Sequence, residues 1–271
     1  MTTSNKQLKI KVTVKKDRVN ACFEFAENIY HSKATSMKNH GNTGVKMRSK
    51  HDFIADIVRG KIAEFAFQKF LEENYDISFE VDVNVYQGEH NHDNGNDLAT
   101  VLIEGEKRAF QYKIDIKGLN LKGHWLLVED HKFWAQMYVV CRLHNIEDAA
   151  EFEKNPYMFK DTEFNVSILG YCMNKHLYDV STNQAWFIFR QGQRLYSSKV
   201  IDSFKPNEVL RNPPKAFYEK LSNQIQNLSI RERFIGPNLI SNINYGLPVK
   251  WLSNDWNNFV AIIKRYSTVS V

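Results

Sequence analysis

Two acidic residues and a lysine in this chain have types and spacing that suit metal-assisted hydrolysis. The stretch AFQYKIDIKGLN, residues 109–120, alternates as a β-strand does, which places Asp115 and Lys117 on one face and apolar side chains on the other. The same alternation is typical of an amphipathic strand with a solvated polar face. A D-x-K triplet alone therefore does not define a site, and a third residue, Asp97 in GNDLA, becomes important.

The spacing predicts an antiparallel hairpin that brings Asp97 beside Asp115. A turn centred near Gly105 places Asp97 opposite residue 113 and diagonal to Asp115. The numbers of paired residues must then sum to an even value for the two aspartates to share a face. A three- or five-residue loop provides this register, and a two-residue turn provides it only with a bulge. We therefore expect two carboxylates at one end of a sheet.

Two carboxylates beside an ammonium group suit a hard divalent cation. Mg²⁺ binds carboxylates, waters and a substrate phosphate, so we expect Asp97, Asp115 and the backbone carbonyl of Ile116 to be its ligands. Lys117 would orient or activate a water for in-line attack on phosphorus, and the metal would lower the pKa of that water. Glu64 would complete the set as an accessory ligand, through a water or a second ion.

The elements that must position these residues follow from hydrophobic periodicity. Apolar residues at helical spacing predict two helices, and alternating segments predict a three-stranded meander. Glu64 lies off the apolar stripe of the second helix, so its default interpretation is a solvated glutamate paired with Lys61 one turn away. The predicted helices are residues 17–32 and 52–72, and the predicted strands are residues 77–86, 97–103 and 108–117.

The remainder of the chain predicts more strands and then helices. Residues 133–143 and 164–173 are apolar enough for interior strands, although the first segment also fits a helix. Residues 185–201 predict a hairpin with its turn at residues 191–193. After Pro206 the pattern becomes helical and irregular.

These elements predict an α/β or α+β core with additions at both ends. We expect a basic helical arm and loop at residues 1–50, a catalytic core at residues 51–205 and a helical C-terminal extension at residues 206–271.

Length and cysteine usage limit the class of protein. A chain of 271 residues is long enough to bury a sizeable core without a metal or disulfide. Its three cysteines are odd in number and widely spaced, which indicates a reducing compartment. No segment resembles a signal peptide or a membrane span, so we expect a cytoplasmic protein.

Charge is unevenly distributed along the sequence. Residues 1–50 hold eleven Lys or Arg against three acids, whereas residues 72–105 hold nine acids and neither Lys nor Arg. A basic arm beside an acidic patch suits a protein that attracts a polyanion and binds divalent cations, while charge scatter on a solvated surface is the alternative. The candidate backbone-phosphate contacts, in a stretch that also fits a flexible surface loop, are Lys33, Lys38, Lys46, Arg48 and Lys50.

Further candidates for nucleic-acid contact follow the D-x-K strand. Lys122 is a candidate phosphate contact, and His124 is placed to approach the scissile phosphate or a groove. Arg and Gln side chains read guanine and adenine edges in the major groove. The candidates of this kind at the turn of the predicted hairpin are Arg190, Gln191, Gln193 and Arg194, although an exposed turn is usually polar in any case.

The ordered set of motifs resembles a known family. Glu64 in GKIAEFAFQKFL, Asp97 in GNDLA, and Asp115 with Lys117 in IDIKG look like the PD-(D/E)xK nuclease superfamily, particularly type II restriction endonucleases. Asn96 stands where the motif has proline. The resemblance covers about residues 52–190, and no single motif is specific alone.

The resemblance implies a restriction-endonuclease-like core with a central mixed sheet flanked by helices. It implies Mg²⁺-dependent, sequence-specific cleavage of double-stranded DNA to 5′-phosphate and 3′-hydroxyl ends, by a homodimer that has a cognate DNA methyltransferase in the same system. Two alternatives stay open. One is a structure-selective repair or junction nuclease, and the other is a DNA-binding module on the same fold that does not cut.

Overall fold

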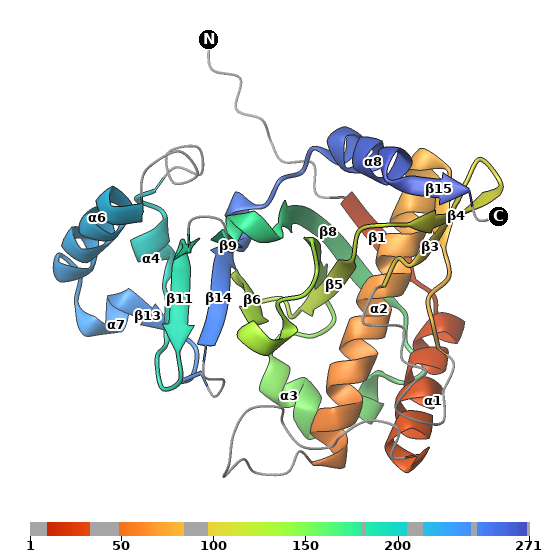
Figure 1. The fold of residues 1–271 in the computed structure, drawn as a ribbon. Helices are drawn as coiled ribbons and strands as arrows, with labels where there is room; N and C mark the ends of the chain where they lie inside the picture. Colours follow the sequence, from red (N-terminus) through yellow and green to blue (C-terminus); the bar gives the residue numbers. More distant parts are fainter. Residues whose placement is uncertain are drawn as a thin grey trace. The chain divides into compact units, whose positions relative to one another are not determined.

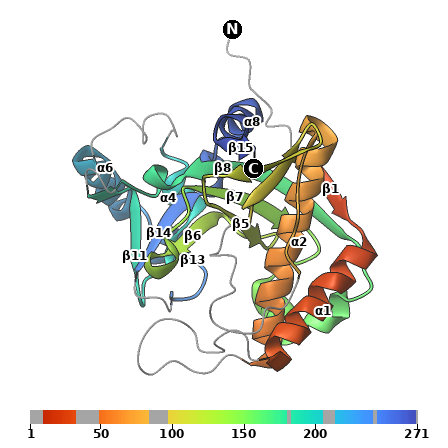
Figure 2. The same cartoon turned by 45° about the vertical axis from the view of Figure 1, so that its right-hand side comes forward.

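Two long helices lie side by side in the computed structural model of this chain (Figures 1 and 2). α1 (Lys16–Ser32) and α2 (Lys50–Tyr75) match the helices predicted at 17–32 and 52–72. Ser49 begins α2 with a capping box, in which its hydroxyl accepts a hydrogen bond from the backbone N–H of Asp52. The structure describes residues 10–32, 49–83, 97–179, 183–204, 214–239 and 243–269.

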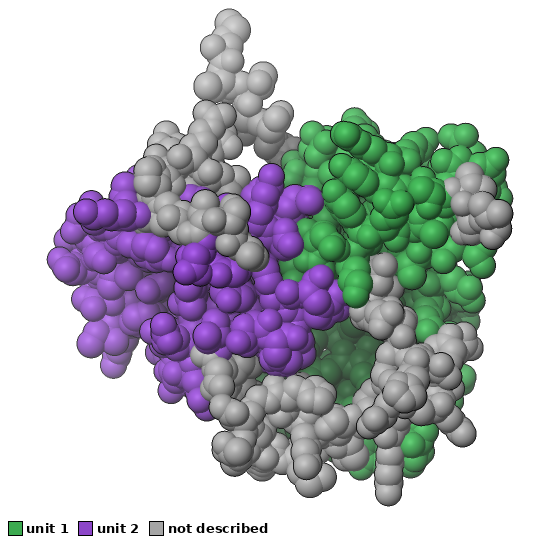
Figure 3. Space-filling view, in the orientation of Figure 1, with its two compact units in different colours: residues 1–123, 135–171, 253–271 green, residues 124–134, 172–252 purple. Residues whose placement is uncertain are grey.

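The chain divides into two units, each of which is described by itself (Figure 3). Unit 1 comprises residues 1–123, 135–171 and 253–271, and unit 2 comprises residues 124–134 and 172–252. This division differs from the three consecutive segments expected from the sequence. Within the described ranges, every helix is too short or too polar to span a bilayer.

A mixed sheet forms the centre of unit 1, which confirms the expected α/β class. β1 pairs antiparallel with β8, whereas β5 pairs parallel with β7, so that Asp115 lies opposite Tyr138. The strands predicted at 133–143 and 164–173 are both present, and the first is not a helix. In order across the sheet, the strands are β1 (Ile10–Val14), β8 (Phe164–Met173), β7 (Met137–Leu143) and β5 (Ile114–Leu119).

A second sheet in unit 1 contains the predicted meander, but in shorter form. Its strands are β15 (Ser267–Val269), β4 (Glu106–Phe110), β3 (Thr100–Ile103) and β2 (Ile77–Phe79), in that order. A two-residue turn at Glu104 and Gly105, both at positive φ, joins β3 to β4 and pairs Ile103 with Glu106. The numbers of paired residues therefore sum to an odd value, whereas the register expected for Asp97 required an even sum.

The strand predicted at 108–117 is wrong as a single element, because the chain changes sheets within it. β4 ends at Phe110 and β5 begins at Ile114. Between them, the backbone N–H of Lys113 donates to Oε1 of Gln136, and the Lys113 carbonyl accepts from the Gln136 backbone N–H. These bonds to the start of β7 turn the chain out of the meander and into the mixed sheet.

Parts of both predicted terminal additions belong to unit 1, whereas residues 206–252 of the predicted C-terminal extension belong to unit 2. β1 lies in the central sheet and α1 packs on α2, so residues 10–32 are not a separate arm. At the other end, α8 (Trp256–Arg265) packs aromatic rings onto α2. The ring centres of Trp256 and Phe70 are 4.9 Å apart, and those of Phe259 and Phe67 are 5.6 Å apart. The short helices of unit 1 are α3 (Ala149–Lys154) and η2 (Pro156–Phe159).

Unit 2 is built on a three-stranded antiparallel sheet, and the hairpin predicted at 185–201 is wrong. β11 pairs with β14, and β12 pairs with β13, so β11 and β12 are not partners. The segment after 206 is accordingly not only helical. The strands are β6 (Trp125–Glu129), β9 (Tyr178–Asp179), β10 (Gln184–Ala185), β11 (Phe187–Arg190), β12 (Leu195–Tyr196), β13 (Phe234–Ile235) and β14 (Ile243–Pro248). The helices are η1 (Asp130–Lys132), η3 (Asn174–His176), α4 (Ser198–Ile201), α6 (Pro214–Gln226), α7 (Ile230–Arg233) and η4 (Val249–Trp251).

Gly118 allows α2 to approach β5 closely. A Cβ atom at this position would lie 2.7 Å from the backbone carbonyl oxygen of Arg59 in α2. Backbone cannot move away as a flexible side chain can, so only glycine fits at this distance. The residue directly after Lys117 therefore sets the spacing between the helix that carries Glu64 and the strand that carries Asp115.

Gly118→Ala is expected to lower the free energy of unfolding by about 1–3 kcal/mol, because the added methyl group overlaps the α2 backbone. Urea denaturation measures this change. Gly60→Ala is the matched control: its Cβ would meet nothing within 4 Å, and it should raise helix stability by roughly 0.5–1 kcal/mol. Equal stability of wild type and Gly118→Ala would contradict the close approach.

Candidate active site

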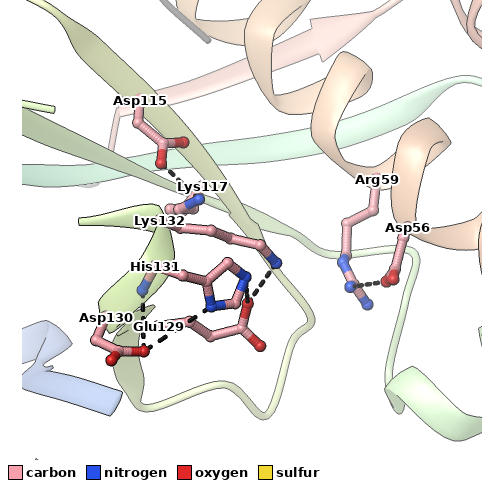
Figure 4. A network of polar contacts seen from close by, with 8 residues as sticks. All are labelled: Asp56, Arg59, Asp115, Lys117, Glu129, Asp130, His131 and Lys132. Carbon is pink, nitrogen blue, oxygen red and sulfur yellow. Dashed lines mark hydrogen bonds and ion pairs between the residues drawn. The ribbon is translucent and has the colours of Figure 1, made fainter. Parts of the chain in front are cut away.

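Asp115 and Lys117 lie together on one face of β5, as the alternation predicts. Oδ2 of Asp115 is 2.6 Å from Nζ of Lys117, and only 9% of the Asp115 side chain is exposed (Figure 4). The interpretation of this face as solvated is therefore wrong at Asp115. Oδ2 is buried and receives no hydrogen bond from the described residues, so the short contact is an ion pair without a well-directed donor.

Asp97 binds directly to the outer edge of β5. Its backbone N–H donates to the carbonyl of Ile114 at 3.1 Å, and its carboxylate Oδ2 accepts from the backbone N–H of Ile116 at 2.7 Å. These groups point away from β7, because alternate residues of a strand direct their backbone groups to opposite edges. One residue thus takes the place of a neighbouring strand. The expected approach of Asp97 to the D-x-K strand is present, although the predicted hairpin register does not produce it.

Glu64 is a buried member of an ion pair. Only 7% of the residue is exposed, and its Oε2 lies 2.8 Å from Nζ of Lys61. The pairing with Lys61 is confirmed, but the glutamate is not solvated. α1 covers this part of α2, and Nζ of Lys61 lies 5.3 Å from the ring centre of Phe25 in α1.

Two neighbouring carboxyl groups influence the ionisation of Asp97. Burial of its carboxyl raises the pKa of Asp97 well above the ordinary range, and Glu64 and then Asp115 raise it further. The backbone N–H of Ile116 and the ammonium of Lys61 act in the opposite direction. Glu64 of α2 and Asp115 of β5 therefore lie close enough to oppose the ionisation of Asp97.

The donors present fit Mg²⁺ by chemical type. They are hard carboxylate oxygens, and Oδ2 of Asp115 is buried with no hydrogen bond from the described residues. In this state, however, the described part of the chain contains no group of three or more His, Cys, Asp or Glu side chains arranged to hold a metal ion. Asp115 and Glu64 are each paired with a lysine instead. The ligand role expected of the Ile116 carbonyl stays a prediction.

The other DNA contacts expected in unit 1 are only partly described. Lys50 is the first residue of α2, with Nζ 5.4 Å from the ring centre of Tyr30. Lys122 is exposed and lies 2.9 Å from a carboxylate oxygen of Glu147. Outside the described residues lie Lys33, Lys38, Lys46 and Arg48.

The remaining candidate DNA contacts belong to unit 2. His124 is exposed, and its carbonyl accepts a hydrogen bond from the backbone N–H of Val249. The turn at 191–193 is present: Oε1 of Gln193 accepts from the backbone N–H of Arg190, and Nε of Arg194 donates to the Gly236 carbonyl. Gln191, like the others, is exposed.

Sequence reasoning did not single out an ion-pair group at the end of β6 and in η1 of unit 2. Nζ of Lys132 pairs with Glu129, and Nε2 of His131 lies 3.4 Å from the same carboxylate (Figure 4). All three side chains are partly exposed, and such pairs contribute little to stability. Close sequence spacing is the signal that could have found the group.

Comparisons with protein-family models, curated proteins and solved structures found no match to this chain. Its function is therefore argued from the site itself.

The raised pKa of Asp97 predicts a pH-dependent stability. A folded-state pKa above the unfolded value means that the free energy of unfolding falls as pH rises from the ordinary Asp range through the raised pKa. Asp97→Asn keeps an acceptor for Ile116 but cannot ionise, so it should melt at a higher temperature than wild type above that window and show no such decline. Thermal melts across pH in EDTA measure the difference.

Asp161→Asn is a control of opposite sign. Hydrogen bonding from Asn20, together with Lys16, lowers the pKa of Asp161, so this carboxylate stabilises the fold above its ordinary pKa and the variant should lose stability at neutral pH. A melting profile of Asp97→Asn parallel to that of wild type at every pH would contradict the electrostatic description.

Proposed function

We propose that this protein is a Mg²⁺-dependent, sequence-specific endonuclease for double-stranded DNA, built on the PD-(D/E)xK fold. The observation that carries the proposal is the arrangement around β5: Asp115 beside Lys117 on one face, and Asp97 bonded to the edge of the same strand. Glu64 adds a third carboxyl group from α2. All four residues belong to unit 1.

The catalytic roles follow from the chemistry of these side chains. Asp97 and Asp115 would hold the metal, with Glu64 as an accessory ligand. When bound, Mg²⁺ supplies the positive charge that lowers the pKa of a water and neutralises the phosphate. Lys117 offers three N–H donors and no acceptor, so it orients the attacking water through the water's oxygen. In-line attack on phosphorus breaks the P–O3′ bond and leaves 5′-phosphate and 3′-hydroxyl ends.

The coarse fold supports the family proposal. A mixed sheet carries the D-x-K motif on β5, and α2 packs against that strand at Gly118. The restriction-endonuclease-like topology, the homodimer, the cognate methyltransferase and the cytoplasmic location are parts of the same proposal.

The distribution of charge also supports binding to a polyanion. Unit 2 contains twelve Lys or Arg and seven Asp or Glu, whereas unit 1 contains twenty-four of each. The formal net charge of +5 is thus carried entirely by unit 2. Unit 1 is neutral and holds the candidate catalytic centre, whereas unit 2 is cationic. This distribution suits cleavage by unit 1 and DNA binding by unit 2.

Purified protein is expected to cut unmethylated phage DNA into discrete bands with Mg²⁺ and to leave it intact in EDTA. Lys117→Ala should slow cleavage about 10²–10⁴-fold, the usual contribution of a positioned proton-transfer or water-orienting group. Asp115→Asn should abolish cleavage while DNA binding stays equal or becomes tighter, since one negative charge facing phosphate is removed. Gel electrophoresis and a filter-binding titration measure the two effects.

Asp56→Asn is the matched control, because Asp56 is an acid of unit 1 paired with Arg59 and has no part in the site. Normal cleavage by Lys117→Ala or Asp115→Asn would remove these residues from the mechanism. Cutting of junctions or flaps without discrete bands would favour the structure-selective nuclease, and DNA binding without any cleavage would favour the non-cleaving module.

DNA binding without Mg²⁺ is expected to weaken steeply with salt. Each lost phosphate contact reduces the slope of log K against log salt by about 0.9. Joint replacement of the five basic candidates between residues 33 and 50 with Gln should therefore lower the slope by up to about 4.5 units. Urea denaturation checks that the variant still folds. An unchanged slope would exclude the segment from phosphate contact. The replaced residues are Lys33, Lys38, Lys46, Arg48 and Lys50.

A further inference from the structure

Arg142 lies on the same face of the mixed sheet as the D-x-K residues. In the parallel pair of β5 and β7, Asp115 is opposite Tyr138, Lys117 is opposite Val140 and Leu119 is opposite Arg142. Side chains of paired residues point to the same side, and alternate residues share a face. Arg142 therefore occupies the next position after Lys117 toward the carboxyl ends of the two strands, where ligands of parallel sheets commonly bind.

The guanidinium of Arg142 makes one hydrogen bond to the described residues. Nη2 donates to the carbonyl of Gly123 at 2.6 Å, whereas Nε is buried and has no hydrogen-bond partner in the described part of the chain. Among the described residues no carboxylate lies within ion-pair distance of Arg142. By contrast, Lys117 and Lys122, which both precede Arg142 in the sequence, have carboxylate partners.

An unpaired, half-buried guanidinium is unfavourable in the free protein. Burial lowers the pKa of Arg142. The group nevertheless stays charged, since arginine is not deprotonated in proteins. An anion would recover the lost solvation, and the planar fork of N–H groups matches two oxygens of a phosphate.

We propose that Arg142 is a phosphate-binding residue that holds the DNA backbone at the carboxyl ends of β5 and β7, beside Lys117. The identity of the anion as a DNA phosphate rests on the proposed function, whereas the anion site rests on the geometry of Arg142 alone. Anchoring of the segment after β5 is the simpler role, but it uses only Nη2 and needs no charge.

The test compares Arg142→Gln with Lys154→Gln, which removes the same charge from an exposed position in α3. Thermal melts are recorded in inorganic phosphate and in chloride of equal ionic strength. Wild type and Lys154→Gln should show a phosphate-specific rise in melting temperature, and Arg142→Gln should show none. If Arg142 has a purely structural role, Arg142→Gln should have a lower melting temperature by the same amount in phosphate and in chloride, with its phosphate response intact. That result would overturn the proposal.

A second arm measures binding of duplex DNA without divalent ions across a salt series. Arg142→Gln should weaken binding roughly 10-fold or more, as loss of a hydrogen bond to a charged group does, and reduce the salt slope by about 0.9. Lys154→Gln should leave both values unchanged. Equal affinity and slope in wild type and Arg142→Gln would overturn the DNA-backbone assignment.

Arg142→Lys keeps the charge and a donor for Gly123, and it replaces the Gln variant if that variant fails to fold. It should retain the salt slope but bind phosphate several-fold more weakly, because the fork is lost; wild-type phosphate affinity would overturn the proposal. Absence of DNA cleavage in Mg²⁺ with a normal phosphate response would defeat the proposed nuclease function and leave the anion site standing. DNA cleavage by the wild type together with an intact phosphate response in Arg142→Gln would overturn the anion site and leave the proposed nuclease function standing.

Discussion

The two hydrogen bonds between Asp97 and the edge of β5 are the interaction on which the candidate site depends. They connect the segment just before β3 of the meander to the strand of the other sheet that carries Asp115 and Lys117. Without them, the meander would have no direct bond to the D-x-K strand at this point, and the second aspartate would have no fixed position. The bond to the Ile116 N–H also favours the ionised form of Asp97, against the burial and the neighbouring acids that oppose it.

The site is a local concentration of negative charge held by a small number of cations. Lys61 pairs with Glu64, and Lys117 pairs with Asp115. Because buried carboxylates are costly unless paired, each ammonium compensates one acid and leaves Asp97 dependent on backbone donors. One bound divalent cation would relieve the same repulsion between the carboxylates. A cluster of this composition therefore suits metal binding.

Local patterns in the sequence predict α1, α2 and β8 well, because periodicity arises within each segment. For the segment of β7 the pattern fitted both a strand and a helix, and the structure has the strand. The division between β4 and β5 was not predicted, since alternation continues through Gln111 to Lys113 while the bonds that redirect the chain come from distant Gln136. The burial of Glu64 depends on packing from α1, which the pattern of α2 does not contain. Likewise, β11 and β12 find partners in β14 and β13, far along the chain, rather than in each other.

The position of α8 has a consequence for synthesis on the ribosome. Its Trp256 and Phe259 pack against Phe67 and Phe70 of α2, the helix that also carries Glu64. A nascent chain that has emerged only as far as unit 2 leaves this aromatic face of α2 uncovered, and β4 still lacks its neighbour β15. Unit 1 therefore completes its core only after α8 and β15 have been made, later than the four residues of the candidate site.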